Sequence, residues 1–144
     1  HPFYTEFPMR SVYLPIVRNL LPDVLSLFDA ADPNGVTAVR NDTTVPSQSL
    51  FLLNSPFLRE QSRHMAQRLL SDQPDDDEQR LQRAHALAFG RTPDPAEATR
   101  ARMFLDAYSK APASQVRPEP ERRLAAWQSY CQALLCQNEF LYLE

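Results

Sequence analysis

The sequence predicts an all-α fold, a compact bundle of about five or six helices with an irregular, proline-rich N-terminal part. Apolar residues in the second half recur at helical spacing, and residues that start and stop helices bound each of these runs. The chain also has two glycines against 13 prolines. Because this leaves few positions free for positive φ and many stiff corners, the composition favours short helices joined by rigid connectors.

The clearest helix of the sequence begins at Asn54-Ser55-Pro56. Ser55 suits the capping position, and proline suits the first helical position, where its missing N–H is not needed. We expect this helix to end near Leu70, before a polar segment that contains Pro74. Its buried face is expected to comprise four residues at helical spacing: Leu58, Met65, Ala66 and Leu69.

The acidic run Asp75 to Glu78 is expected to open the next helix, because negative charge is favourable at a helix N-terminus. Gly90 is expected to end that helix as a C-terminal cap. The residues expected on its inner face are Leu81, Ala84, Ala88 and His85, the last half-buried.

A third helix is predicted to start at Asp94, with Pro95 in its first turn and Glu97 at the capping-box position. Its apolar stripe comprises Ala101, Phe104, Leu105 and Tyr108. Residues 111–120 are expected to form a loop, and a last helix is expected from about Glu121 to Gln137. The buried stripe of that helix comprises Leu124, Trp127, Cys131, Leu134 and Leu135, and the apolar tail that follows is expected to dock on the bundle.

The first half of the chain shows a less regular pattern. Residues 11–18 are expected to be extended, because Pro15 interrupts any helix there. Short helices are predicted over Pro22 to Phe28 and over Pro46 to Leu53, with Thr44 as a possible cap of the second. Between them, Asp29 to Val45 forms a polar connector of a length that is uncommon unless it is functional or well tied down.

Composition and charge fit one globular domain. The chain has 144 residues, of which 43% are hydrophobic, and a net charge of −3. This balance gives no electrostatic reason to expect nucleic acid, and no run of about 18 apolar residues exists that would cross a membrane. No signal peptide is visible, and the start at His1 suggests a fragment or a processed product. We expect a single helical domain over residues 1–144, the C-terminal module of a larger protein.

Catalytic and metal-binding motifs find little support. Cys131 and Cys136 lie about 140° apart around the predicted helix, so they are expected to be small buried residues rather than a redox pair. His1, His64 and His85 show no metal-ligand spacing, and we expect His64 to face solvent. Glycine-rich phosphate loops, dinucleotide fingerprints and nucleophile elbows are missing from the sequence. We therefore assign no catalytic residue and no metal ligand.

Polar residues of the stretch from Arg10 to Phe57 are the best candidates for a binding site. Arginine guanidinium groups there suit either a buried ion-pair network, which holds the connector on the helices, or contact with a carboxylate, phosphate or sugar hydroxyl. Thr44 and Asn54 have structural alternatives as a helix cap and a turn residue. The candidate binding residues are Arg18, Asn19, Arg40, Asp42, Thr43 and Asn54.

Four segments carry a resemblance to a known family: RSVYLPIVRNLLPDVLSLFDAADP, VRNDTTVPSQSLFLLNSPF, ALAFGRTPDPAE and AWQSYCQALLCQNEFLYLE. Together they resemble the C-terminal domain of unknown function of large planctomycete-type proteins, over Arg10 to Glu144. The resemblance implies an exported, extracytoplasmic multidomain polypeptide, commonly with a cytochrome c-like segment upstream. Haem would then belong to linked domains, so no cofactor is expected in this chain. The resemblance supplies no established catalytic residue.

Three functions are compatible with these observations. The first is a non-catalytic helical interaction or scaffolding module, which packs on other domains of the same polypeptide. The second is part of an enzyme site acting on polysaccharide, with Arg18, Arg40 and Asp42 lining a pocket. The third is a docking surface for electron transfer to the linked cytochrome. No nucleic-acid partner and no membrane span are expected.

Overall fold

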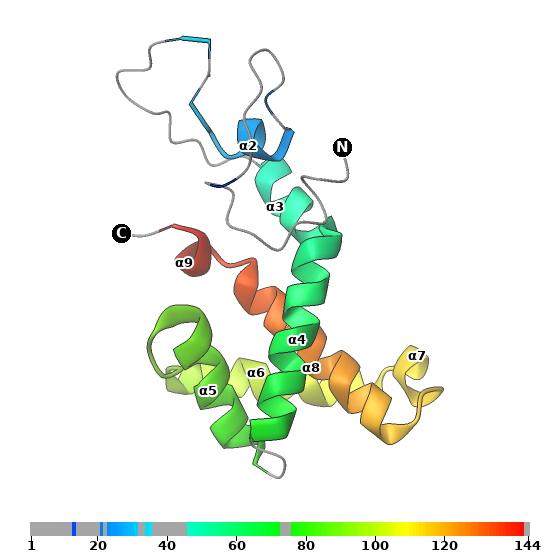
Figure 1. Cartoon of the computed structure of the whole chain (residues 1–144). Coiled ribbons are helices and arrows are strands. Elements are labelled where there is room, and N and C mark those ends of the chain that lie inside the picture. Colours follow the sequence, from blue (N-terminus) through cyan, green and yellow to red (C-terminus); the bar gives the residue numbers. More distant parts are fainter. Residues whose placement is uncertain are drawn as a thin grey trace. The chain divides into compact units, whose positions relative to one another are not determined.

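The computed structural model describes residues 13, 21, 23–31, 34–35, 46–72 and 76–142, and every regular element among them is helical. The predicted all-α class is therefore confirmed. The chain divides into two compact units, His1–Leu52 and Leu53–Glu144, which are described separately below (Figure 1). The expectation of a single domain stays a prediction.

The first unit contains α2 (Asp23–Leu27) and most of α3 (Pro46–Asn54), so both predicted short helices are confirmed. The buried side chain of Gln48 on α3 donates a hydrogen bond from Nε2 to the carbonyl oxygen of Leu27 at 2.9 Å. Phe28 and Phe51 meet edge to face with ring centroids 6.1 Å apart. These two contacts tie α2 to α3 within the unit. Most residues of the predicted extended segment and connector, including Thr44, lie outside the described residues.

The second unit begins with the end of α3, followed by α4 (Pro56–Asp72). Ser55 caps α4 as predicted, because its Oγ accepts a hydrogen bond from the backbone N–H of Leu58 at 3.3 Å. The helix continues two residues past the expected end at Leu70. Of the four predicted inner residues, Leu58, Ala66 and Leu69 are buried and Met65 is half-buried.

The next helix, α5 (Asp77–Phe89), opens within the predicted acidic run and ends before the predicted C-terminal cap, Gly90. Asp76 is its N-cap and accepts a hydrogen bond from the backbone N–H of Gln79 at 3.0 Å, which lowers the pKa of the Asp76 carboxyl. Gly90 follows the helix with φ of 72°, in the left-handed region that glycine adopts without a steric penalty. The inner face is as expected, except that His85 is fully rather than half-buried and that Arg80 is buried too.

Gly90→Ala is expected to lower the free energy of unfolding by about 1–2 kcal/mol, because a side chain with Cβ is strained at positive φ. No atom lies within 4 Å of the added Cβ, so backbone strain alone carries the cost. Gly90→Asn is the matched control, since asparagine tolerates the left-handed region better and should lose less. Urea unfolding followed by circular dichroism measures both. Equal losses of stability for the two variants would show that backbone strain at positive φ is not the cause.

The capping box predicted at the start of α6 (Pro95–Lys110) is present in full. Asp94 accepts a hydrogen bond from the backbone N–H of Glu97 at 2.7 Å, and the Glu97 carboxylate accepts one from the backbone N–H of Asp94 at 2.8 Å. Ala101 is buried as expected. Phe104 departs from the predicted stripe, because its side chain is 38% exposed on the side of α6 that borders a pocket.

The expected loop over residues 111–120 is the clearest error of the prediction. The segment contains a short helix, α7 (Pro112–Gln115), and α8 (Glu119–Leu135) begins before the loop was expected to end. Both helices carry proline in the first turn, where its fixed φ and missing N–H start a helix instead of breaking it. The prolines of this segment were therefore interpreted as a sign of a loop, whereas they lie at the starts of two helices.

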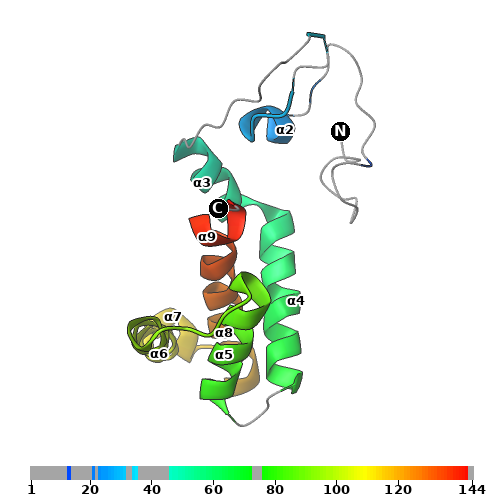
Figure 2. The same ribbon diagram turned by 90° about the vertical axis from the view of Figure 1, so that its left-hand side faces the viewer.

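The core of the second unit lies where α4 and α8 run side by side, as the two views show (Figures 1 and 2). Helices α5 and α6 add to it from their inner faces. Amide groups of α8 reinforce the contact, because Gln128 donates to the Arg59 carbonyl at 3.1 Å and Gln132 to the Leu53 carbonyl at 2.9 Å. The buried core consists of Ala66, Leu69, Leu81, Ala84, Ala101, Trp127, Tyr130, Cys131 and Leu134.

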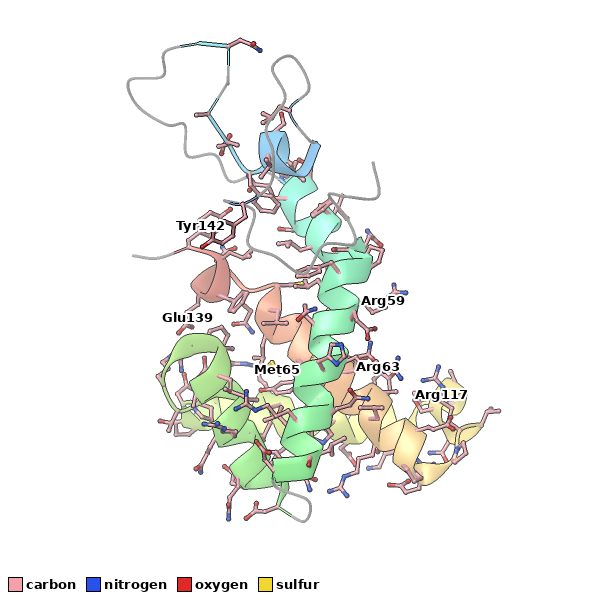
Figure 3. All side chains as sticks on the ribbon, in the orientation of Figure 1. Arg59, Arg63, Met65, Arg117, Glu139 and Tyr142 are labelled. Atoms are coloured by element: carbon pink, nitrogen blue, oxygen red, sulfur yellow. The ribbon has the colours of Figure 1, made fainter. Side chains whose placement is uncertain are left out.

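The C-terminal tail forms α9 (Asn138–Leu141), which contacts α5 and α8. The tail docks as predicted, although its polar contact was not foreseen: Glu139 is ion-paired with Arg91 at 2.7 Å. Figure 3 places Glu139 at the α9 end of the unit, Met65 on the α5 side of α4, and the exposed Arg59 and Arg63 on the other side of that helix. The tail is thus held in place by an ion pair to Arg91.

Candidate functional site

The residues predicted from sequence to bind a ligand fall almost entirely outside the described part of the chain. This holds for Arg18, Asn19, Arg40, Asp42 and Thr43, so their hypothesis stays a prediction. Asn54 is described and is the exposed last residue of α3. It does not line the pocket described next.

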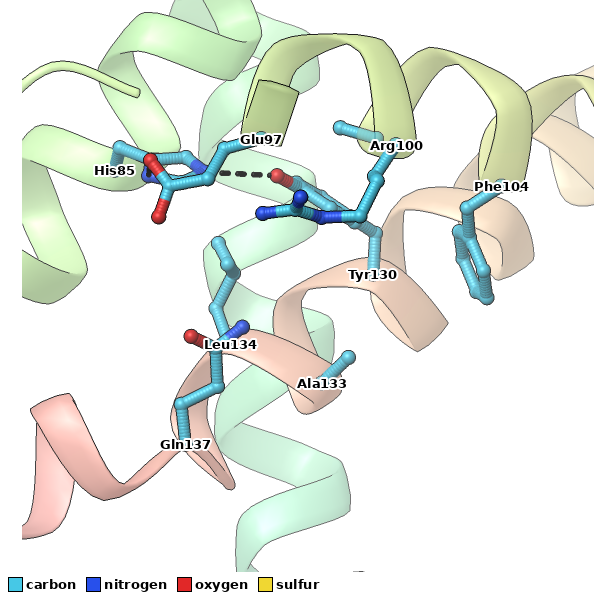
Figure 4. Close-up of a pocket in the computed structure, with 9 residues that line it drawn as sticks. His85, Glu97, Arg100, Phe104, Tyr130, Ala133, Leu134 and Gln137 are labelled. Atoms are coloured by element: carbon cyan, nitrogen blue, oxygen red, sulfur yellow. Dashed lines mark hydrogen bonds and ion pairs between the residues drawn. The ribbon is translucent and has the colours of Figure 1, made fainter. Parts of the chain in front are cut away.

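A small pocket of about 190 Å³ opens between α5, α6 and α8 of the second unit (Figure 4). One wall is polar and the other is apolar, and both are built from helices that the core holds in place. This volume is below the several hundred Å³ typical of drug-sized ligand sites, so it fits a small group. The lining residues are His85, Glu97, Arg100, Ala101, Phe104, Tyr130, Ala133, Leu134 and Gln137.

The innermost polar contact of the pocket joins His85 of α5 to Tyr130 of α8. His85 Nε2 and the Tyr130 hydroxyl oxygen are 3.0 Å apart, and the His85 residue is 2% exposed. Burial lowers the pKa of His85, so its imidazole is neutral at pH 7, and burial raises the pKa of the Tyr130 hydroxyl. Both groups are therefore uncharged at pH 7 and are joined by one hydrogen bond.

Glu97 stands at the rim of the pocket within a four-residue network. Arg91 Nη1 and Nη2 donate to the two Glu97 oxygens at 2.8 and 2.7 Å. Nε and Nη2 of the same guanidinium donate to Glu139 at 2.7 and 2.8 Å. These hydrogen bonds lower the pKa of Glu97 to about 2 and also lower that of Glu139. Together with the backbone N–H of Asp94, the network fixes the start of α6 against α9.

One buried atom of the pocket has no hydrogen-bond partner among the described residues: Nδ1 of His85. The nearest charged atom, Glu97 Oε2, lies 3.9 Å away, which is too far for a hydrogen bond. That oxygen already accepts two hydrogen bonds, from Arg91 Nη1 and from the backbone N–H of Asp94. Since buried polar atoms are nearly always paired, an orphan beside a cavity marks a place for a further group.

Two more polar side chains border the same space. Arg100 of α6 and Gln137, which follows α8, form no side-chain hydrogen bond or ion pair with any part of the chain that the structure describes. Figure 4 shows the Arg100 guanidinium reaching toward the Tyr130 hydroxyl, with Gln137 on the far side of Leu134. A cation and an amide are therefore free to contact a bound group.

Among the described residues, other chemically active side chains offer no competing site. Burial raises the pKa of the Cys131 thiol to about 12 and also raises that of Cys136, so both thiols are poor nucleophiles. Both are free cysteines. His64 is exposed as predicted, and its Nε2 lies 3.2 Å from Glu60 Oε1. Within the described ranges, no group of three or more histidine, cysteine or carboxylate side chains could hold a metal ion.

Tyr130→Phe is expected to lower the free energy of unfolding by about 1–3 kcal/mol, because it removes the partner of His85 Nε2 and leaves that buried atom unpaired. Urea unfolding of the variant measures the loss. Tyr108→Phe is the control: Tyr108 lies on α6 beside Phe104, and its ring is not part of the pocket lining. A loss for Tyr130→Phe no greater than for the control would show that the hydrogen bond contributes little.

The pocket was not predicted, although the sequence contains part of the evidence for it. Helical spacing placed His85 on the inner face of its helix, and an inward histidine needs a polar partner. Tyr130 follows Trp127 by three residues and precedes Leu134 by four, so it belongs to the same buried stripe. Nothing in the sequence indicates that these two residues, 45 positions apart, meet.

Comparison with known proteins places the chain in one family. No curated protein and no solved structure matches it significantly. A family described as "Protein of unknown function (DUF1553)" matches residues 5–105, well over half of the chain. The match includes α2 to α5 and most of α6, with the pocket residues His85, Glu97 and Arg100. The chain belongs to this DUF1553 family of proteins of unknown function.

Proposed function

We propose that this chain is a non-catalytic helical interaction module, which packs on other domains of the same polypeptide. The observation that carries the proposal is a pair of large apolar side chains of the second unit, exposed on either side of the break between α3 and α4. Leu53 is 51% exposed and Phe57 is 52% exposed. Large apolar side chains exposed to water cost free energy and, where they gather, are typical of surfaces that meet a partner.

Further exposed apolar side chains support the same function. In the first unit, Leu50 and Phe51 of α3 are each more than one-third exposed. A partner domain with an apolar surface would suit these side chains best.

The setting that we propose follows from the resemblance of the sequence. It is an extracytoplasmic, planctomycete-type multidomain polypeptide with a cytochrome c-like segment upstream. Haem in this setting belongs to the linked domain. None of the helices in the described ranges has both the length and the apolar character needed to cross a membrane.

Hydrogen exchange on the full-length gene product tests the proposal. We expect amides around Leu53 and Phe57 to exchange more slowly in the full-length polypeptide than in this chain alone. The double change Leu53→Ser and Phe57→Ser should abolish that difference, because it removes the apolar contact area. The control is Met103→Ser, which changes an apolar residue on α6 that is more exposed, at 67%.

Two results would reject the proposal. One is a full-length gene product that contains no domain besides this chain. The other is equal exchange around Leu53 and Phe57 in the long and short proteins.

A further inference from the structure

The pocket between α5, α6 and α8 has an arrangement of donors that indicates what it binds. Tyr130 and Glu97 contact opposite nitrogens of the His85 ring. The negative charge of Glu97, 3.9 Å from Nδ1, favours the tautomer with its proton on Nδ1. The Tyr130 hydroxyl then donates its proton to Nε2. Nδ1–H is left as a buried donor without an acceptor.

Glu97 does not satisfy this donor. Its Oε2 lies too far from Nδ1 and already accepts from Arg91 and from the Asp94 backbone. Arg91 donates two hydrogen bonds to Glu97 and two to Glu139, so these three side chains together keep a net charge of −1. A bound anion must offset this charge through its pairing with Arg100. The pocket therefore contains an unpaired hydrogen-bond donor, Nδ1–H of His85, which needs an acceptor oxygen.

Arg100 determines the charge of the group that fits. Its guanidinium lines the pocket and has no counter-ion in the part of the chain that the structure describes. Guanidinium groups bind carboxylates through strong, charge-assisted hydrogen bonds. The remaining wall is formed by Phe104, Ala133 and Leu134, which suit a few methylene groups.

We propose that this pocket binds a carboxylate carried on a short aliphatic chain, with its oxygens on Arg100 and His85 Nδ1 and its chain on Leu134. The volume of about 190 Å³ admits a ligand of this size. Such a group is either a free short-chain acid or the acidic side chain of a polypeptide. The proposal goes beyond an interaction module, because it assigns a specific ligand chemistry to a site within the second unit.

Titration with butyrate, followed by ¹H–¹⁵N NMR of the backbone amides and of the His85 ring nitrogens, tests the site. We expect saturable shifts at Arg100, Tyr130 and Gln137, together with a shift of the protonated Nδ1 of His85. Butyramide has the same length and an acceptor oxygen but no charge, and butylammonium has the opposite charge. Binding of butyramide as tight as that of butyrate, or no saturable shift with butyrate, would overturn the proposal.

Two exposed substitutions separate binding from folding. Arg100→Gln should weaken butyrate binding by at least about tenfold, because it removes a charge-assisted hydrogen bond. Arg83→Gln makes the same change on the exposed side of α5, away from the pocket lining, and should leave binding unchanged. Equal affinity in the two variants would overturn the proposal.

A final comparison identifies the source of the carboxylate. Acetylated glutamate amide carries the same short acidic chain on a peptide backbone. Tighter binding of this compound than of butyrate would support the site and assign it to an acidic polypeptide side chain. Tighter binding of butyrate would support the site and assign it to a free short-chain acid.

Discussion

Replacing Trp127 by alanine is expected to lower the free energy of unfolding by about 3–5 kcal/mol. Trp127 is 2% exposed, in the core that α4, α5 and α8 share. Its ring meets Tyr130 edge to face at 5.8 Å, and the Arg80 guanidinium lies 5.7 Å from its centroid. Alanine removes the aromatic contacts and leaves a cavity, because helices packed on all sides relax only partly.

Urea unfolding followed by circular dichroism is the suitable measurement, since Trp127 is the only tryptophan and its fluorescence is lost in the variant. Val116→Ala is the control, because Val116 is 87% exposed and its change should stay within about 0.5 kcal/mol. Trp127→Phe should lose less than the alanine variant, since it keeps one ring in the core. A loss below about 1 kcal/mol for Trp127→Ala would contradict the described packing.

Acid is expected to destabilise the protein in two steps. The first begins as pH falls below 6.5, the ordinary His85 pKa, because burial lowers the pKa in the folded state and the unfolded chain takes up the proton first. The second runs from pH 4.5 down to about 2, because hydrogen bonds from Arg91 hold the Glu97 pKa at about 2. A depressed carboxyl pKa contributes stability above 4.5, and that stability is lost as pH falls.

The Glu97 step is expected to amount to about 1–2 kcal/mol, after allowing for solvent screening at the pocket rim. Glu97→Gln should reduce this step, because glutamine does not titrate, while Glu139 and Asp76, whose pKa values are also lowered, still do. Glu121→Gln, at an exposed carboxylate of α8, should keep it. His85→Gln should remove the first step only. Measuring the free energy of unfolding between pH 7 and pH 2 distinguishes these cases, and identical curves for all variants would show that neither group is responsible.

Local sequence signals predicted much of the second unit correctly. Ser55, Asp94 and Gly90 each act on a backbone group within four residues, so their effect is readable without the fold. The same holds for the helical spacing that placed Leu69 and Trp127 in the core. The error at residues 111–120 is also local: proline stops a helix in its interior and starts one in its first turn, and the sequence does not say which applies.

The candidate site could not be predicted in this way, because its residues come from three separate helices. His85, Glu97 and Tyr130 each look ordinary in their own segment: an inward histidine, a capping-box glutamate and a core tyrosine. Their chemistry arises only when α5, α6 and α8 pack, which buries the imidazole and leaves Nδ1 beside a cavity. The binding residues predicted from the sequence were chosen because they are polar and close together along the chain. Local polarity does not show which side chains come together in the folded structure.

The sequence by itself determined the all-α class, the helix boundaries set by caps, and the apolar faces, because each depends on neighbours within one or two turns. It also carried the resemblance to a domain of unknown function. Only the tertiary structure decided that Arg91 joins Glu97 to Glu139, and that Tyr130 leaves one His85 nitrogen unpaired. Contacts between residues tens of positions apart depend on how helices pack, and helical spacing fixes which face is buried but not which side chain it meets.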